Sequence, residues 1–184
     1  MLYTLQPAIV ASISTAYARK GLAPSYPRSV KHTMDFDALS ATMRKWQSTL
    51  RLNDWDIKLE LVTKAWRKTG DVKIDQANKV AIVLINACNP KQTNIEAVII
   101  HELLHIKLWG MDQMIEALIH AVYGDDEATP QFSFAYTQFM ELLECTTQDL
   151  TKGYVALGAE DKSASYGRIQ QQADDEWKGR QDGD

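Results

Sequence analysis

Apolar and polar positions alternate along the chain with two different periods. Between Asp35 or Asp37, either of which can cap a helix, and Asn53, apolar residues recur three and four positions apart and predict a helix. Residues 55–61 then alternate strictly between apolar and polar side chains, which is the pattern of a strand with one buried face. The first organised part of the chain therefore reads as a helix followed by a strand.

Two shorter apolar runs follow that strand. Residues 72–74 predict a short strand, and the β-branched and aliphatic run at 80–85 predicts a well-buried one. Polar residues at 68–71 and at 76–79 predict the turns on either side of the first of them.

Residues 95–109 are apolar on nearly every side of a helix, which is typical of a central, buried helix. The preceding Thr93-Asn94-Ile95-Glu96 matches a capping box, in which the Thr93 hydroxyl and the Glu96 carboxylate each accept a hydrogen bond from a free backbone N–H. Gly110 suits the C-terminal cap of this helix.

Two more helices are expected before the chain turns polar. One spans residues 111–123 and is closed by Gly124, and the other begins at Thr129-Pro130 and runs to about Leu150.

The chain is long enough for one domain with a substantial core. We expect that domain at residues 34–155, preceded by an appendage at 1–33 with a possible short helix from Ile9 to Lys20. Residues 156–184 are expected to form a polar, mobile tail.

Charge and cysteine content narrow the classes of partner and compartment. The net charge is −4, and the lysines and arginines are scattered, so no direct nucleic-acid partner is expected. No apolar run approaches the roughly 18 residues of a membrane span. The two cysteines, Cys88 and Cys145, suit a reducing compartment. A cytoplasmic location is expected, with secretion through an atypical N-terminal signal as the alternative.

The predicted central helix contains His101-Glu102-Leu103-Leu104-His105, an H-E-x-x-H motif. Residues four apart share a helix face, so His101 and His105 can direct two imidazole nitrogens at one zinc ion, and Glu102 can act as general base on a water molecule. Burying these three side chains is costly unless they are satisfied, and a metal would satisfy them together.

A catalytic zinc usually takes three protein ligands, and the third must come from elsewhere. Position 111, where the extended form of the motif needs a histidine, is a methionine. The remaining candidates are Asp112, Glu116, His120, Glu141 and Glu144.

Glu144 is the preferred third ligand because it borders the apolar stripe of the last predicted helix. Glu141 points further round that helix and is the fallback. His120 is a competitor as a ligand, although a lone histidine on an apolar helix is more often a packed core residue.

These segments resemble small zincin-like metallopeptidases encoded by bacteria, phages and prophages, and more broadly a minimal gluzincin. The resemblance covers Asp35 to Tyr154 and rests on the Asn94–His105 run, the Trp55-Asp56-Ile57 strand and the Glu144–Gly153 stretch. It implies an α+β fold, in which a small mixed or antiparallel sheet of three or four strands packs on the central motif helix, with further helices on one side. It also implies His101, His105 and Glu144 as ligands of one Zn²⁺ ion and Glu102 as base.

The function expected from motif and resemblance is a zinc-dependent hydrolase, most simply a peptidase acting on a peptide or protein substrate held along an edge strand. Donors that could stabilise the transition state are His120, Tyr123, Tyr136 and Tyr154, which the sequence does not rank. The alternative is a non-catalytic zincin-fold protein with a binding or structural role in a phage, prophage or bacterial system. A regulatory, DNA-associated protein of a mobile element is a weaker third hypothesis.

Overall fold

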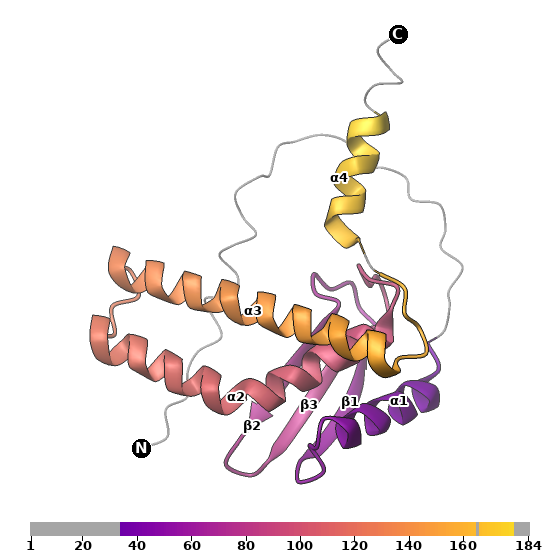
Figure 1. Cartoon of the computed structure of the whole chain (residues 1–184), viewed down its shortest axis with the longest axis horizontal. Coiled ribbons are helices and arrows are strands. Elements are labelled where there is room, and N and C mark those ends of the chain that lie inside the picture. The colour runs from indigo at the N-terminus through magenta and orange to yellow at the C-terminus, as the bar shows by residue number, and fades with distance from the viewer. Residues whose placement is uncertain (1–33, 165, 179–184) are drawn as a thin grey trace. The chain divides into compact units, whose positions relative to one another are not determined.

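The computed structural model describes residues 34–164 and 166–178. The predicted N-terminal appendage, with its short helix at 9–20, lies outside the described residues. The described elements are, in chain order, α1 (Phe36–Thr49), β1 (Asp56–Val62), β2 (Gly70–Asp75), β3 (Val80–Asn86), α2 (Ile95–Tyr123), α3 (Pro130–Gly158) and α4 (Gly167–Lys178) (Figure 1).

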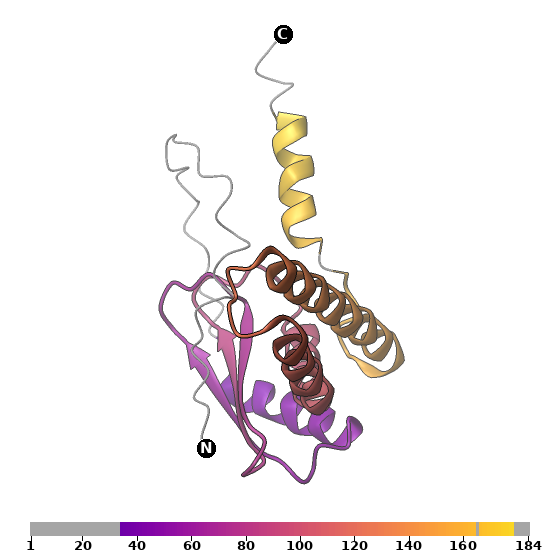
Figure 2. The ribbon, with the colours of Figure 1, turned by 90° about the vertical axis from the view of Figure 1, so that its left-hand side faces the viewer.

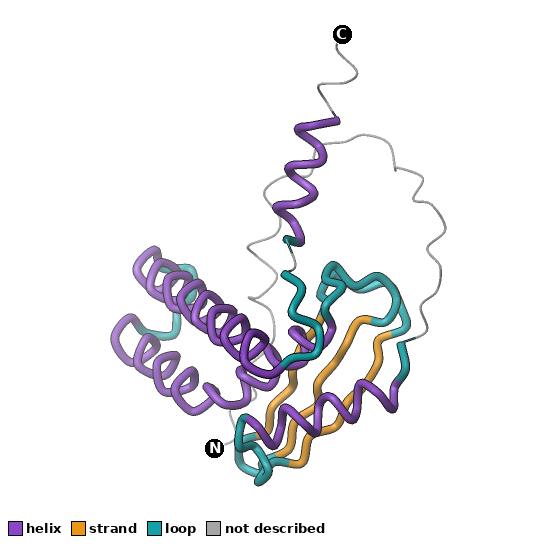
Figure 3. The backbone as a smooth tube through the Cα atoms, turned by 45° about the vertical axis from the view of Figure 1, so that its right-hand side comes forward, coloured by secondary structure: helices purple, strands orange, loops and turns teal. Residues whose placement is uncertain are grey.

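The sheet has three strands in the order β1-β3-β2 (Figure 3). β1 pairs with β3 in parallel, and β2 pairs with β3 antiparallel, so the sheet is mixed. On the central strand Ala81, Val83 and Ile85 are buried, because alternate residues of a strand point to the same face. The prediction of an α+β fold with a small mixed sheet is confirmed.

The buried face of the sheet packs against α1 and α2, which lie on the same side of it (Figure 2). Trp46 of α1 and Leu103 of α2 are among the fully buried side chains of this core. α3 packs along α2, so the motif helix lies between the sheet and another helix. No helix among the described residues is long and apolar enough to cross a membrane.

The two helices predicted at 95–109 and 111–123 are one continuous helix, α2, of 29 residues. The predicted C-cap at Gly110 is therefore wrong; the helix ends at Tyr123, and the cap is Gly124, with φ 82°. We refer to residues 95–109 as the proximal half of α2 and to residues 110–123 as the distal half.

The start of α2 also differs from the predicted capping box. Its N-cap is Asn94 rather than Thr93, and the Asn94 side-chain oxygen accepts a hydrogen bond from the Ala97 N–H at 2.9 Å. The Glu96 carboxylate does not close the box. It instead accepts hydrogen bonds from Trp46 Nε1 at 2.7 Å and from the Glu160 N–H at 2.9 Å, which connects α2 to α1 and to the segment after α3.

Four other predicted boundaries move. α1 ends at Thr49 rather than near Asn53, and β2 begins at Gly70, inside the predicted turn. α3 continues past Leu150 to Gly158, where the helix passes close to the Trp46 ring, so the domain boundary predicted at 155 cuts a helix. The predicted polar tail contains the helix α4.

Candidate metal centre

Two histidines from the proximal half of α2 form the base of the site. His101 and His105 are four residues apart on the helix, and their rings converge so that the two Nε2 atoms lie 3.1 Å apart. Both side chains are mostly buried, since less than a fifth of each is exposed.

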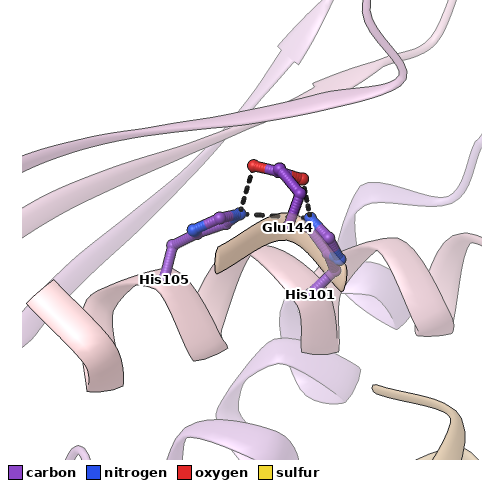
Figure 4. Close-up of side chains that lie close together, drawn as sticks. All are labelled: His101, His105 and Glu144. Carbon is purple, nitrogen blue, oxygen red and sulfur yellow. Dashed lines mark hydrogen bonds and ion pairs between the residues drawn. The ribbon is translucent and has the colours of Figure 1, made fainter. Parts of the chain in front are cut away.

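Glu144 of α3 completes the cluster. Its carboxylate lies over both rings, with Oε2 at 3.5 Å from His101 Nε2 and Oε1 at 3.4 Å from His105 Nε2 (Figure 4). The neighbouring Leu143 and Thr147 are buried, which fixes the rotation of α3 so that Glu144 faces the histidines. The structure thus brings together the three residues that the sequence selected.

The three side chains are close enough together to hold one metal ion. Two ligand atoms at about 2.0–2.2 Å from a tetrahedral zinc are about 3.3–3.6 Å apart. The two Nε2 atoms, at 3.1 Å, are slightly closer than this, and each lies 3.4–3.5 Å from a different oxygen of the Glu144 carboxylate. With one ligand atom taken from each residue, all three lie within 4.8 Å of one another. Two imidazoles and one carboxylate are also a ligand set that zinc accepts. Within the described residues, this is the one group of three such side chains close enough to hold an ion.

Glu102, which follows His101 directly in the sequence, is buried, with 7% of its surface exposed. Its burial is the main cause that raises the pKa of this carboxyl group to about 7, and the charges of Asp71 and Glu144 raise it further. Nearby His101 and Lys68 act in the opposite direction. A buried carboxyl group with a pKa near neutrality can both take up and release a proton.

The backbone of the edge strand β2 makes room for Glu102. A Cβ atom added at Gly70 would lie 2.5 Å from Glu102 Oε1 and 2.6 Å from Val98 Cγ1. Real Cβ atoms do not approach neighbours this closely, so the carboxylate occupies the space that a side chain at position 70 would need. Gly70 therefore places the start of β2 directly against the candidate base.

Sequence reasoning treated residues 68–71 as a turn and missed this contact. Next to Gly70, the Asp71 carboxylate accepts from Lys68 Nζ at 2.9 Å and pairs with Lys73 Nζ at 2.6 Å. Burial opposes ionisation of Asp71, but its two lysine partners outweigh this effect and lower its pKa. The glycine itself could have indicated this contact, because a glycine in a strand often marks a place where another group approaches the backbone closely.

The charges of the cluster are coupled. The hydrogen bond with His101 is the main cause that lowers the pKa of Glu144. Burial works against a charged His101, but Glu144 and Glu102 outweigh it, and the pKa of His101 is raised. For His105 burial dominates and lowers the pKa, which favours the neutral ring that a metal needs. The Nδ1 atom of His101 is buried without a hydrogen-bond partner.

The other candidate ligands lie apart from the cluster. Glu141 is exposed and accepts a hydrogen bond from Gln138, so the structure does not support it as a fallback. His120 lies near the end of α2, where Nδ1 is 3.1 Å from Asp125 Oδ1 and the ring packs edge-on against Phe132. Glu116 accepts from Gln113 on its own helix, and Asp112 is likewise outside the group that could hold an ion.

The four predicted transition-state donors have contacts of their own. His120 is held by Asp125, and Tyr123 is exposed at the end of α2. Tyr136 stacks on Phe132 with ring centroids 5.8 Å apart, and the Tyr154 ring packs edge-on against Trp46 in the core. These positions do not single out one of the four as a donor to the cluster.

Comparisons of the chain with protein-family models, with curated proteins and with solved structures find no match.

Proposed function

We propose that this protein is a zinc-dependent hydrolase of the zincin type and that its substrate is a peptide or protein. The observation that carries the proposal is the cluster of His101, His105 and Glu144, whose candidate ligand atoms, one from each residue, all lie within 4.8 Å of one another. Glu102 lies beside this cluster as a buried group of raised pKa.

Each residue has a defined role in this proposal. His101 and His105 bind the ion through Nε2, and Glu144 adds one negative charge. When bound, zinc supplies Lewis acidity that polarises a carbonyl group and makes a water molecule more acidic. Glu102, which lies on the same helix as the two histidines, would accept the proton from the attacking water and pass it to the leaving amine.

The position of β2 supports a peptide as substrate. The order β1-β3-β2 leaves one side of β2 without a partner strand among the described strands. An extended peptide can pair with such an edge through backbone hydrogen bonds. Because Gly70 of β2 touches the Glu102 side chain, a peptide paired there would run past the candidate base.

A non-catalytic role for the same metal site is the second candidate. It is favoured by the contacts of two of the four expected transition-state donors, since His120 interacts with Asp125 and the Tyr154 ring packs against Trp46. In that case zinc would connect α2 to α3 and stabilise the fold without chemistry.

Substitution of Glu102 by Gln separates the two candidates. The zinc-loaded wild type and Glu102→Gln are incubated with a proteome-derived peptide library, and new termini are identified by mass spectrometry. We expect cleavage by the wild type, at least a 100-fold loss in Glu102→Gln, and equal zinc content in both.

The matched control is Glu141→Gln, an exposed carboxylate on α3 that should leave cleavage unchanged. A zinc-loaded wild type that cleaves nothing would support the non-catalytic candidate. Equal cleavage by Glu102→Gln would remove Glu102 from the mechanism.

A further inference from the structure

The apolar face by which α2 enters the core continues beyond the core. In the proximal half, Ile99, Ile100, Leu103 and Leu104 are at most 2% exposed against the sheet and α1. At the same face of the same helix, spaced three and four residues apart, the distal half carries Met111, Met114, Leu118 and Val122. We call these four residues the distal stripe.

The distal stripe is exposed because the sheet ends before it. A Cβ atom at Gly110 would be 3.7 Å from Gln76 Nε2, so the β2–β3 turn reaches α2 at the junction of its two halves. Beyond that point α2 and α3 extend past the sheet as a helical hairpin (Figure 1). The four side chains of the stripe are 46–61% exposed.

α3 covers a different face of the distal half. Ile119 of α2 and Phe132 of α3 are the buried residues there, and on the helix Ile119 is turned away from the stripe. No element of residues 34–164 and 166–178 covers the stripe, since its side chains keep about half their surface.

The hairpin is also strongly acidic. Between Lys107 and Lys152 the chain contains no lysine or arginine, whereas it contains eight acidic residues: Asp112, Glu116, Asp125, Asp126, Glu127, Glu141, Glu144 and Asp149. Histidines and Lys152 are the cationic partners that these acidic residues have within the described hairpin: His120 lies beside Asp125, His101 and His105 lie beside Glu144, and Lys152 pairs with Asp149. Burial first, and then the charges of Glu116 and Glu144, raise the pKa of Asp112 to about 6.

The charge decides between possible occupants of the stripe. A second copy of this chain would bring an equally acidic hairpin into contact, and like charges repel. A partner with lysine or arginine beside its apolar residues would bury the stripe and neutralise the hairpin together. Two of the four stripe residues are methionines, whose flexible side chains adapt to varied apolar surfaces.

We propose that the distal stripe is the docking site for a basic amphipathic helix of another protein, whose apolar side chains pack on Met111, Met114, Leu118 and Val122. Lysine or arginine side chains of that helix are attracted by the net negative charge of the hairpin. The proposal does not depend on the metal centre, which lies on another face of α2.

The probe that tests it is a fluorescent helical peptide of about 18 residues made of leucine and lysine, long enough to hold a helix on binding. Its affinity for the full chain is measured by fluorescence anisotropy at low and at physiological salt. We expect saturable binding that weakens with salt, and at least a tenfold loss of affinity in Met114→Gln/Leu118→Gln. Circular dichroism checks that the variant stays folded, which is expected because both side chains are exposed.

The matched control is Phe134→Gln/Leu157→Gln, which removes two exposed apolar side chains of α3 outside the stripe and should leave the affinity unchanged. The proposal is overturned by no binding, or by equal loss in the control. It is also overturned if a leucine and glutamate peptide binds as tightly. Concentration-dependent dimerisation that Met114→Gln/Leu118→Gln abolishes would assign the stripe to a second copy instead.

Discussion

The two halves of α2 have similar apolar content on the same face but opposite environments. Leu103 in the proximal half has no exposed surface, whereas Leu118 in the distal half is 55% exposed. The difference comes from what lies against the helix, because the sheet and α1 cover the proximal half, and the β2–β3 turn reaches α2 at Gly110. Apolar periodicity therefore identifies a helix face that can be buried, but it does not show whether another part of the same chain buries it.

The same contrast explains where the candidate metal centre lies. His101, Glu102 and His105 belong to the proximal half, where the surrounding elements leave Glu102 only 7% exposed and each histidine side chain less than a fifth exposed. His120 belongs to the uncovered half and interacts with an exposed carboxylate. A low-dielectric surrounding strengthens electrostatic interactions, which favours metal chemistry in the first half.

The largest effect that tests the contrast is a matched pair of truncations. Leu103→Ala should lower the free energy of unfolding by about 2–5 kcal/mol, because it opens a cavity in a fully packed core. Leu118→Ala should change it by less than about 0.5 kcal/mol. Urea unfolding measures both, and similar losses for the two variants would show that the distal half is covered in the folded chain.

A second test uses the burial of Glu102 in the metal-free protein. Its pKa is raised from 4.5 to about 7 on folding. The neutral form is therefore favoured in the folded state, and this contribution to stability is fully present below pH 4.5 and lost as the pH rises through 7.

Glu102→Gln cannot ionise, so it should gain stability relative to the wild type between pH 5 and pH 8, by up to about 3 kcal/mol. Thermal unfolding at the two pH values, with a chelator present, measures the difference. A difference between the proteins that does not vary with pH would contradict the burial of this group.

The contact between β2 and the proximal half of α2 predicts a smaller effect on stability. Gly70→Ala should destabilise the chain by about 1–3 kcal/mol, because the new methyl group meets Glu102 and Val98. The cost should shrink in the Glu102→Ala background, and a double-mutant cycle measures that coupling. Gly153→Ala is the control, since nothing lies within 4 Å of the added Cβ there. Additive effects at 70 and 102 would argue against the close approach.

The smallest effect concerns the junction of the two halves. If α2 is continuous, Gly110→Ala should stabilise it by about 0.5–1 kcal/mol, because alanine is the better helix former. At Gly124, with φ 82°, alanine should instead destabilise by about 1 kcal/mol. The midpoint of thermal unfolding should rise in Gly110→Ala and fall in Gly124→Ala. A lower midpoint for Gly110→Ala would instead support a helix that ends at Gly110.

Local patterns predicted much of this structure. The alternation at 55–61 and the apolar run at 80–85 correspond to β1 and β3, and the spacing of His101 and His105 predicted that their rings would converge. Glu144 could be predicted as the third ligand because the apolar positions of a helix show which polar residues lie at the border of its buried face.

The features that were missed depend on tertiary contacts. Gly110 reads as a helix end because glycine is a common cap, but nothing in a local window shows that the helix continues to pack on α3. Glu96 matches a capping box, yet Trp46, distant in sequence, is its partner. The role of Gly70 depends on where a strand passes a helix, which no local pattern contains.

The most direct test of the central claim is the zinc content of purified protein after equilibrium dialysis against micromolar zinc. We expect one ion per chain in the wild type and in Glu141→Ala, and none in His101→Ala or Glu144→Ala. The pair Glu141 and Glu144 is matched in residue type, helix and exposure, so only the position toward the histidines differs. A wild type without bound zinc, or loss of zinc in Glu141→Ala but not in Glu144→Ala, would contradict the assignment of this metal centre.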